Sequence, residues 1–457
     1  MRAVLERAMT HIDNAYDIPH VRISGFMCKT NLPTNTAFRG FGGPQGMMIS
    51  EGVITHVAES LKKPVEEIRE LNFYQVNDLT QYNQKLTDFH IERVWHELMA
   101  TSDFYRRLDS VKEFNLKNKF KKRGISAIPT KFGLSFTARF LNQASALVHV
   151  YTDGSVLISH GGTEMGQGLH TKMVQVAAQA LGIPISKVHL SETNTNMVAN
   201  TSATAASVSS DLNGMAILDA CEQINERLKP FKNGKEDQTW EELISAAYFE
   251  RVNLSANGHY KTPDLSYDWE TNEGMMYSYF TYGAACTEVE IDVLTGDHSV
   301  IRSDLVMDIG KSINPSIDIG QIEGAFTQGQ GWCTIEEPLI SASSGVLLTR
   351  GPGLYKIPGF RDIPVDFRVR LIKGSRNSRA IHSSKAVGEP PFFLGASVFF
   401  AIREAIKDAR KENGIEDYFV LDCPATSERI RMSCVDNLTK LAATPLKDGE
   451  KPFSIRA

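Results

Sequence analysis

The feature that most constrains the fold of this chain is a pattern that occurs twice along it. Alternating residues predict a strand pair over 146–159, joined by an Asp153-Gly154 turn, and a second pair over 287–308. Each pair is followed by a polar or glycine-rich loop and then by a helix, which ends near Gly182 in the first case and includes Gly320–Phe326 in the second. This recurrence predicts a large α+β unit with an internal pseudo-repeat.

Helical periodicity predicts further helices outside the two repeats. Apolar residues at helical spacing indicate helices over 2–16, 45–61 and 391–411. Residues 91–123 also look helical and are highly charged, and they end in the basic run Lys117–Arg123. We interpret this run as a solvated helix face before a domain boundary near Gly124.

Composition excludes several classes of protein. The 457 residues include 49 Lys and Arg against 54 Asp and Glu, so the net charge of −5 does not suit a general nucleic-acid binder. The longest apolar stretch, 391–402, is shorter than the roughly 20 residues that cross a bilayer and is broken by Gly395, so no membrane span is expected. The six cysteines form no C-x-x-C pair, and their spacing suggests no zinc site, iron–sulfur cluster or disulfide framework. We therefore expect reduced thiols and a cytoplasmic location.

Four segments have residues suited to a site, and each has a plainer structural interpretation. Glycines in Gly161–Gly168 bring backbone N–H groups to a helix start, which suits either an anion or a tight turn. The small residues of 200–210 suit either a phosphate or polar ring, or close helix packing. Arg39–Pro44 is either a backbone that approaches a flat ligand or a glycine-rich turn around a core Phe41. Glu389 precedes two prolines and is either a carboxylate stabilised by a helix start or a buried base.

Three of these motifs occur in one order at wide spacing: Thr30–Gln45, Gly161–His170 and Lys385–Pro391. Together they closely resemble the molybdopterin-binding portion of the xanthine dehydrogenase and aldehyde oxidase family, and the resemblance covers nearly the whole chain. It implies a Mo-molybdopterin cofactor whose metal takes no direct ligand from the protein. It also implies that residues 1–80 are the end of a first, truncated molybdopterin-binding domain and 81–124 a helical connector. A second such domain then covers 125–400, and a C-terminal helix and tail cover 401–457.

The resemblance also assigns roles to individual residues. Glu389 matches the catalytic glutamate, which removes a proton from a hydroxyl ligand of molybdenum, while Phe41, Phe136 and Thr137 match the positions that hold the flat substrate. Arg7 matches the arginine that stabilises negative charge on a purine; on its own it would be a surface helix arginine. The positions that match cofactor-lining residues are Arg39, Gln167, Ala205, Ala206, Ser207, Ser209 and Gln321, of which Arg39 and Ala206 neighbour the molybdenum.

Arg7 favours a purine substrate, with oxidation of hypoxanthine to xanthine and of xanthine to urate. Two alternatives remain: an aldehyde oxidase, and a non-catalytic remnant. Members of the family are far longer and carry two [2Fe–2S] clusters and FAD, with NAD as electron acceptor, so we expect this chain to be a fragment of such a protein. The resemblance further implies a homodimer through the molybdenum domains of the full-length protein, and the composition leads us to expect no binding to nucleic acid or membrane.

Overall fold

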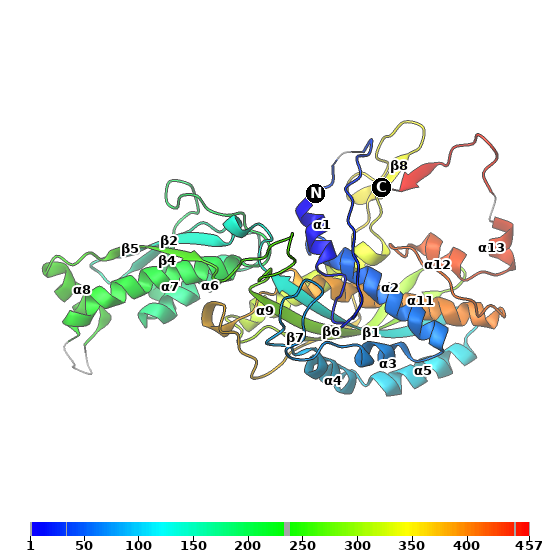
Figure 1. The fold of residues 1–457 in the computed structure, drawn as a ribbon, viewed down its shortest axis with the longest axis horizontal. Helices are drawn as coiled ribbons and strands as arrows, with labels where there is room; N and C mark the ends of the chain where they lie inside the picture. Colours follow the sequence, from blue (N-terminus) through cyan, green and yellow to red (C-terminus); the bar gives the residue numbers. More distant parts are fainter. Residues whose placement is uncertain (1, 33, 233–237, 443–444, 457) are drawn as a thin grey trace.

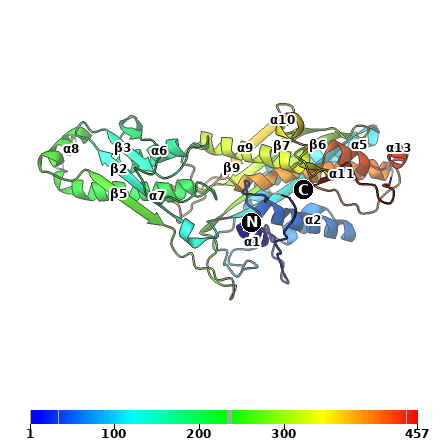
Figure 2. The same ribbon diagram turned by 90° about the horizontal axis from the view of Figure 1, so that it is seen from above.

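The computed structural model describes residues 2–32, 34–232, 238–442 and 445–456. Two four-stranded sheets form two lobes along the longest axis, with the smaller sheet among helices α6, α7 and α8 and the larger sheet among the remaining long helices (Figure 1). The view from above shows the same two lobes end to end (Figure 2). The strand orders are β4-β3-β2-β5 in the smaller sheet and β1-β6-β7-β9 in the larger one.

The larger sheet is buried on both faces. Its strands are β1 (Lys121–Leu134), β6 (Tyr279–Asp292), β7 (His298–Asp308) and β9 (Asp366–Leu371). β1 pairs antiparallel with β6 and β6 with β7, whereas β7 and β9 run parallel. Successive residues of β6 enter opposite cores: Ala285 and Val289 pack with α11 (Ala396–Glu412), while Ala284 and Cys286 pack with α4 (Ile91–Thr101). This two-sided burial explains why the strand reads as a nearly continuous apolar run.

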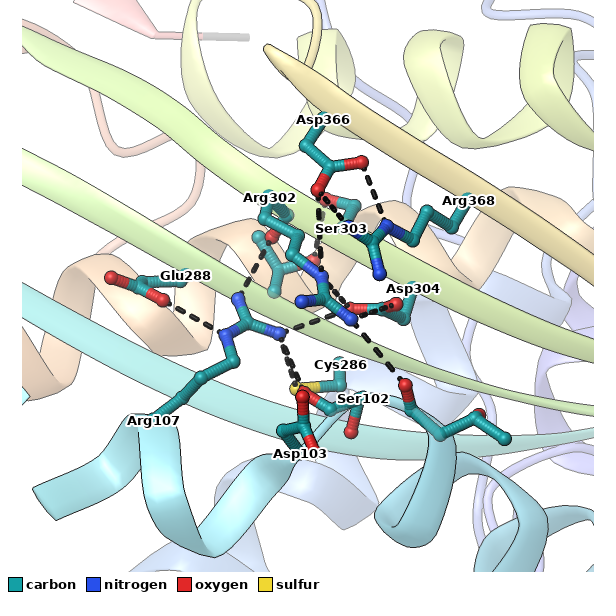
Figure 3. Close-up of polar contacts among 12 residues, drawn as sticks. Ser102, Asp103, Arg107, Cys286, Glu288, Arg302, Ser303, Asp304, Asp366 and Arg368 are labelled. Carbon is teal, nitrogen blue, oxygen red and sulfur yellow. Dashed lines mark hydrogen bonds and ion pairs between the residues drawn. The ribbon is translucent and has the colours of Figure 1, made fainter. Parts of the chain in front are cut away.

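Ion pairs fasten α5 (Phe104–Lys117) to the sheet. The Arg107 guanidinium donates to Glu288 Oε2 at 2.9 Å and to Asp304 Oδ2 at 3.0 Å, and Arg302 also pairs with Asp304 (Figure 3). Arg107 and Asp304 are buried, and each charge has a partner of the opposite sign. Other elements of this lobe are α1 (Arg2–Met9), α2 (Gly43–Leu61), α3 (Val65–Leu71), α9 (Pro315–Thr334), α10 (Gly351–Leu354) and the short 3-10 helix η5 (Pro390–Gly395). A second 3-10 helix, η4 (Ile381–Ser383), buries Ile381 in the core of the smaller sheet.

The smaller sheet contains the first predicted strand pair. β2 (Gln143–Val150) pairs antiparallel with β3 (Val156–His160), as the Asp153-Gly154 turn predicts. Alternate residues of β2 are buried against the core shared with α6 (Leu169–Leu181) and α7 (Ser209–Leu228). The other elements of this lobe are β4 (Val188–Leu190), β5 (Ser255–Lys261), α8 (Trp240–Phe249) and the 3-10 helices η1 (Arg139–Leu141), η2 (Ile185–Lys187) and η3 (Lys229–Phe231).

The predicted pseudo-repeat is present in both lobes. Each repeat is an antiparallel strand pair, a loop, a helix and a further strand that runs parallel to the second strand of the pair. The first repeat is β2-β3-α6-β4, and the second is β6-β7-α9-β9. One more antiparallel strand completes each sheet, β5 beside β2 and β1 beside β6. The α+β class predicted from the sequence is therefore confirmed.

Two of the predicted helices are wrong in extent. The helix expected over 2–16 ends at Met9, because the chain turns there. Within 91–123, α5 ends at Lys117 and β1 begins at Lys121, so the basic run is not a solvated helix face. Lys122 is buried, and its ammonium group donates to the carbonyl oxygens of Asn115 and Asn118 at 2.8 and 2.7 Å. A charged residue enters the strand here because the end of α5 offers it oxygen acceptors.

The C-terminal region packs on the larger lobe. It contains α12 (Ser427–Ser433), α13 (Asn437–Ala442) and β10 (Ser454–Arg456), and β10 pairs with β8 (Leu339–Ser341). The predicted domain boundaries at 80, 124 and 400 stay predictions; the second falls inside β1 and the third inside α11. Within the described part of the chain, no helix has the length and hydropathy needed to cross a membrane.

Candidate functional site

One cavity of about 720 Å³ lies where the two lobes meet, and every site residue predicted from the sequence lines it. The cavity brings together four stretches that are far apart in the chain: residues 37–41, 136–141, 203–211 and 384–389. The predicted residues in its wall are Arg7, Arg39, Phe41, Phe136, Thr137, Gln167, Ala205, Ala206, Ser207, Ser209, Gln321 and Glu389. The structure thus gathers these residues, while their individual roles stay predictions.

Glu389 points away from the helix that follows it. It stands at the N-cap of η5, yet its side chain makes no capping hydrogen bond there. Instead Oε1 accepts from the Gly40 amide at 3.1 Å, and Oε2 accepts from the Ser207 hydroxyl at 3.0 Å. The Ser207 oxygen accepts in turn from the Glu389 amide at 2.7 Å. The carboxylate is therefore held by two donors at the cavity wall, where a base can reach a ligand.

Arg39 is held beside this carboxylate. Its Nε donates to the Gly388 carbonyl at 2.6 Å, and one terminal nitrogen lies 3.2 Å from Gln321 Oε1. Burial lowers the pKa of Arg39 from its usual value, and the charge of Glu389 opposes that shift. An arginine remains charged at any physiological pH, so the cavity wall carries a fixed positive charge next to Glu389.

The backbone around these groups is strained. Phe41, Ala206 and Ser207 have positive φ angles of 50°, 56° and 58°, in a region that non-glycine residues seldom occupy. Such conformations cost about 1–3 kcal/mol each and persist where the surrounding structure enforces them, often at functional sites. At Gly42 an added Cβ would lie 2.0 Å from the Val4 carbonyl oxygen, which explains the glycine next to Phe41. Phe41 is half-buried and lines the cavity, so it is not an ordinary core residue.

Arg7 is a buried residue and not the surface arginine that its helix alone would suggest. Only 2% of it is exposed, and its guanidinium lies 5.1 Å from the ring centre of Phe132 and 5.2 Å from that of Tyr277. It donates to the carbonyl oxygens of Gly133 and Ser135. These contacts fix a positive charge at the cavity end formed by α1.

Phe136 and Thr137 lie on a turn that a single side chain holds. Asn142 Oδ1 accepts from the Phe136 amide at 2.8 Å, and Asn142 Nδ2 donates to the Phe136 carbonyl at 3.0 Å. Phe136 is half-buried, and with Phe38 and Phe41 it is one of three phenylalanines that line the cavity. The turn is therefore pre-formed, which suits the binding of a flat molecule.

The glycine loop is already filled by one of its own carboxylates. Glu164 accepts from the amides of Gly166, Gly168 and His170 at 2.8–2.9 Å. The Gly168 and His170 amides lie at the start of α6 and the Gly166 amide lies in the loop, so the loop offers an incoming anion fewer free N–H groups than its sequence suggests. Burial works to raise the pKa of Glu164, but these three hydrogen bonds outweigh it and lower the pKa. Of this loop, Met165 and Gln167 line the cavity.

Four buried charged residues in the cavity wall were not predicted: Lys172, Asp211, Asp318 and Lys385. Lys172 pairs with Asp318 Oδ1 at 2.5 Å, which joins α6 of one repeat to α9 of the other. One signal was available for Lys172, which shares a helix face with Leu169 and Val176 and is a charge among apolar residues. Asp211 and Asp318 lie in the first turns of α7 and α9, where an acidic residue is ordinarily explained by its interaction with the helix dipole.

The cavity fits a large anionic cofactor that brings its own metal ligands. In the described ranges, no group of three or more His, Cys, Asp and Glu side chains is placed to hold a metal ion. The 20-residue helix α7 begins at the cavity with Ser209, and no side chain caps its N-terminus. An uncapped helix start with adjacent hydroxyl groups is a good binding place for a phosphate.

This cavity, in this pair of α+β repeats, defines a class of protein. The chain belongs to the family of molybdopterin cofactor-binding domains, because two models described as "Molybdopterin cofactor-binding domain" match residues 1–73 and 97–364. The predicted Mo-molybdopterin cofactor is therefore the one that its family binds.

Comparison with curated proteins identifies more specific relatives within this family. The chain is 58% identical over 454 residues to "Xanthine dehydrogenase/oxidase" of Gallus gallus and 55% identical over 455 residues to "Xanthine dehydrogenase" of Emericella nidulans. Both matches cover 99% of this chain and 33% of the relative, so the chain spans about a third of the length of these proteins. The resemblance inferred from the three motifs is thereby confirmed.

Solved structures agree on the fold. The aldehyde oxidoreductase from Desulfovibrio desulfuricans superposes with a TM-score of 0.79 at 26% identity, over 94% of this chain and 45% of that one. Quinoline 2-oxidoreductase from Pseudomonas putida superposes with a TM-score of 0.80 at 23% identity, over 94% of this chain and 57% of that one. The second likeness concerns the fold alone.

Proposed function

We propose that this chain is the molybdenum-cofactor portion of a purine hydroxylase that oxidises hypoxanthine to xanthine and xanthine to urate. The observation that carries the proposal is the placement of Glu389, Arg7, Phe41 and Phe136 around a single cavity. When bound, the molybdenum cofactor supplies the two-electron oxidation that hydroxylates the substrate with oxygen from water. The relatives named xanthine dehydrogenase support the choice of substrate.

We assign a different role in this reaction to each group of cavity residues. Glu389 takes up a proton from the water-derived nucleophile: two donors fix its carboxylate at the cavity wall, whereas Asp318 is paired with Lys172 and Asp211 accepts from Tyr279. Phe41 and Phe136 hold the purine ring flat, in the orientation that attack requires. Arg7 opposes the negative charge that grows on the purine during attack. Arg39, Gln321 and the start of α7 hold the cofactor.

The electron path requires groups outside this chain, whereas we expect the assembly to form through the molybdenum domains. We propose two [2Fe–2S] clusters and FAD in the complete polypeptide, with NAD as acceptor, and a cytoplasmic homodimer. The threefold greater length of the relatives leaves room for these groups.

The proposal is tested by Glu389→Gln in the full-length protein. We expect xanthine turnover to fall by at least about 10³-fold, near the upper range of a lost general base, while molybdenum content stays at the wild-type level. Glu222→Gln is the matched control, because Glu222 is an exposed glutamate that does not line the cavity. Urate formation at the wild-type rate by Glu389→Gln would rule the proposal out.

Substrate class is tested by Arg7→Met. We expect kcat/KM for xanthine to fall by about 10–100-fold, as for the loss of one charge-stabilising contact. Turnover of an aromatic aldehyde, which builds no charge on a purine ring, should be affected much less. Unchanged xanthine turnover would point instead to an aldehyde oxidase.

A further inference from the structure

The segment that carries Glu389 has no regular secondary structure of its own. Residues 385–389, called the Glu389 strap below, join η4 to η5 as irregular chain. A carboxylate on such a segment keeps its place only if other elements hold the backbone. Three hydrogen bonds hold the two ends of the strap. Arg39 donates to the Gly388 carbonyl, and the Glu389 amide donates to the Ser207 hydroxyl. At the other end the Lys385 amide donates to the Ile309 carbonyl at 2.7 Å.

A separate pair of side chains holds the middle of the strap. Tyr279 and Thr281 are two residues apart on β6, so they point to the same face of the sheet. The Ala386 amide donates to Tyr279 Oη at 2.9 Å, and Thr281 Oγ1 donates to the Ala386 carbonyl at 2.9 Å. Both polar groups of one residue are thus bound by side chains of a rigid, buried strand.

Asp211 sets the direction of the Tyr279 hydroxyl. The Tyr279 hydroxyl donates its single proton to Asp211 Oδ2 at 2.5 Å, which leaves an oxygen lone pair for the Ala386 amide. Burial raises the pKa of Asp211 to about 7, although the hydrogen bond from Tyr279 and the charge of Lys172 favour the ionised form. Asp211 also lines the cavity, so the strap is tied through Tyr279 to the start of α7.

We propose that Tyr279 is a positioning residue for Glu389: its hydroxyl, oriented by Asp211, holds the Ala386 amide and thereby fixes where the Glu389 carboxylate stands in the cavity. Tyr279 is not among the residues that line the cavity, so it acts through the strap. The catalytic consequence rests on the proposed role of Glu389, whereas the structural part does not.

The structural part is tested by amide exchange in the cofactor-free full-length protein. In Tyr279→Phe the Ala386 amide loses its acceptor, and we expect its exchange to become about tenfold faster, as for the loss of one hydrogen bond. Tyr74→Phe is the matched control, since Tyr74 is also buried and donates to an aspartate, Asp13, at 3.1 Å. It should lower thermal stability by a similar amount and leave Ala386 exchange unchanged. Wild-type exchange at Ala386 in Tyr279→Phe would overturn the proposal.

The catalytic part is tested on the cofactor-loaded protein. We expect Tyr279→Phe to lower kcat by about tenfold with KM within about twofold, because Glu389 is misplaced while the substrate contacts remain. Thr281→Val, which removes the donor to the Ala386 carbonyl, should show the same split between kcat and KM. An equal loss of kcat in Tyr74→Phe would overturn the catalytic part. If the wild type itself does not oxidise xanthine, the proposed function fails, and the exchange result still decides whether Tyr279 positions the strap.

Discussion

The two repeats share their topology but not their use of the loop that precedes the helix. In the first repeat the loop between β3 and α6 closes on itself, with the Glu164 carboxylate binding three amides of the loop and helix start. In the second repeat the loop between β7 and α9 binds a distant segment: the Lys311 amide donates to the Ser383 carbonyl at 2.8 Å, and Ile309 accepts from Lys385. The loop of the first repeat therefore lines the cavity itself, whereas the loop of the second repeat positions the strap that carries Glu389.

The two repeats also differ in how deeply one of their ion pairs is buried. Lys385 is fully buried and lies 2.8 Å from Asp308 at the end of β7 and 2.9 Å from Asp88. Burial works to raise the pKa of Asp308, but hydrogen bonding from His90 and the charge of Lys385 outweigh it and hold the pKa well below its usual value. In the first repeat Lys187 pairs with Glu241 at the surface. The Lys385–Asp308 pair beside the second repeat is thus buried, whereas the Lys187–Glu241 pair of the first repeat is partly exposed.

The largest expected effect comes from breaking the buried pair. Lys385→Met removes one of the two cations that face buried Asp308 and leaves His90, 2.7 Å away, as its remaining partner. The change should lower the free energy of unfolding by about 3 kcal/mol, the low end for breaking a buried pair, because one partner remains. Lys187→Met is the matched change in the first repeat and should cost no more than about 1 kcal/mol, because its pair is partly exposed to water. Urea unfolding of the two cofactor-free variants measures both values. Equal losses would show that the two repeats do not differ in this way.

Two histidines should give the halves opposite pH responses. Hydrogen bonds to Asp308 and Asp88 raise the pKa of His90 from 6.5 to about 9. The folded state then holds this proton more tightly, so the stabilisation is fully present below pH 6.5 and is lost as the pH rises through about 9. Burial and the nearby His170 lower the pKa of His160, at the end of β3, to about 4. The unfolded state binds that proton more tightly, so stability falls as the pH drops from 6.5 toward 4.

Thermal midpoints across pH separate the two responses. His90→Gln should flatten the alkaline side of the stability profile and leave the acid side unchanged. His160→Gln should do the reverse, and each variant serves as the control for the other. A loss of both slopes in either variant would contradict the assignment.

Sequence patterns predicted the features that depend on neighbours in the chain. The β2–β3 hairpin follows from alternation and an Asp-Gly turn, and α2 follows from apolar residues at helical spacing. The sequence motif identified the Glu389 strap, but it did not predict the residues that hold the strap in place. Its partners lie 105 residues away at Thr281, 182 at Ser207 and 349 at Arg39, and no local pattern encodes such distances.

The same limit explains the errors. Lys117–Arg123 has the composition of an exposed helix, and only the pairing with β6 makes its last three residues, 121–123, part of a strand. Lys172 and Asp318 are ordinary helix residues until α6 and α9 meet at the cavity. Where tertiary contact decides burial, propensity is a weak guide.

The smallest expected effect concerns the two helix starts. Glu164 satisfies the amides at the start of α6, and Asn314 caps α9 by accepting from the Ile317 amide at 3.2 Å. Removing either side chain with Glu164→Ala or Asn314→Ala should cost about 1 kcal/mol, the usual value of a helix cap. The two variants should differ in a second measurement: Glu164→Ala also frees the loop that carries Gln167, so molybdenum should be lost from it faster during dialysis. If both variants release molybdenum equally fast, the self-closed loop of the first repeat has no special part in holding the cofactor.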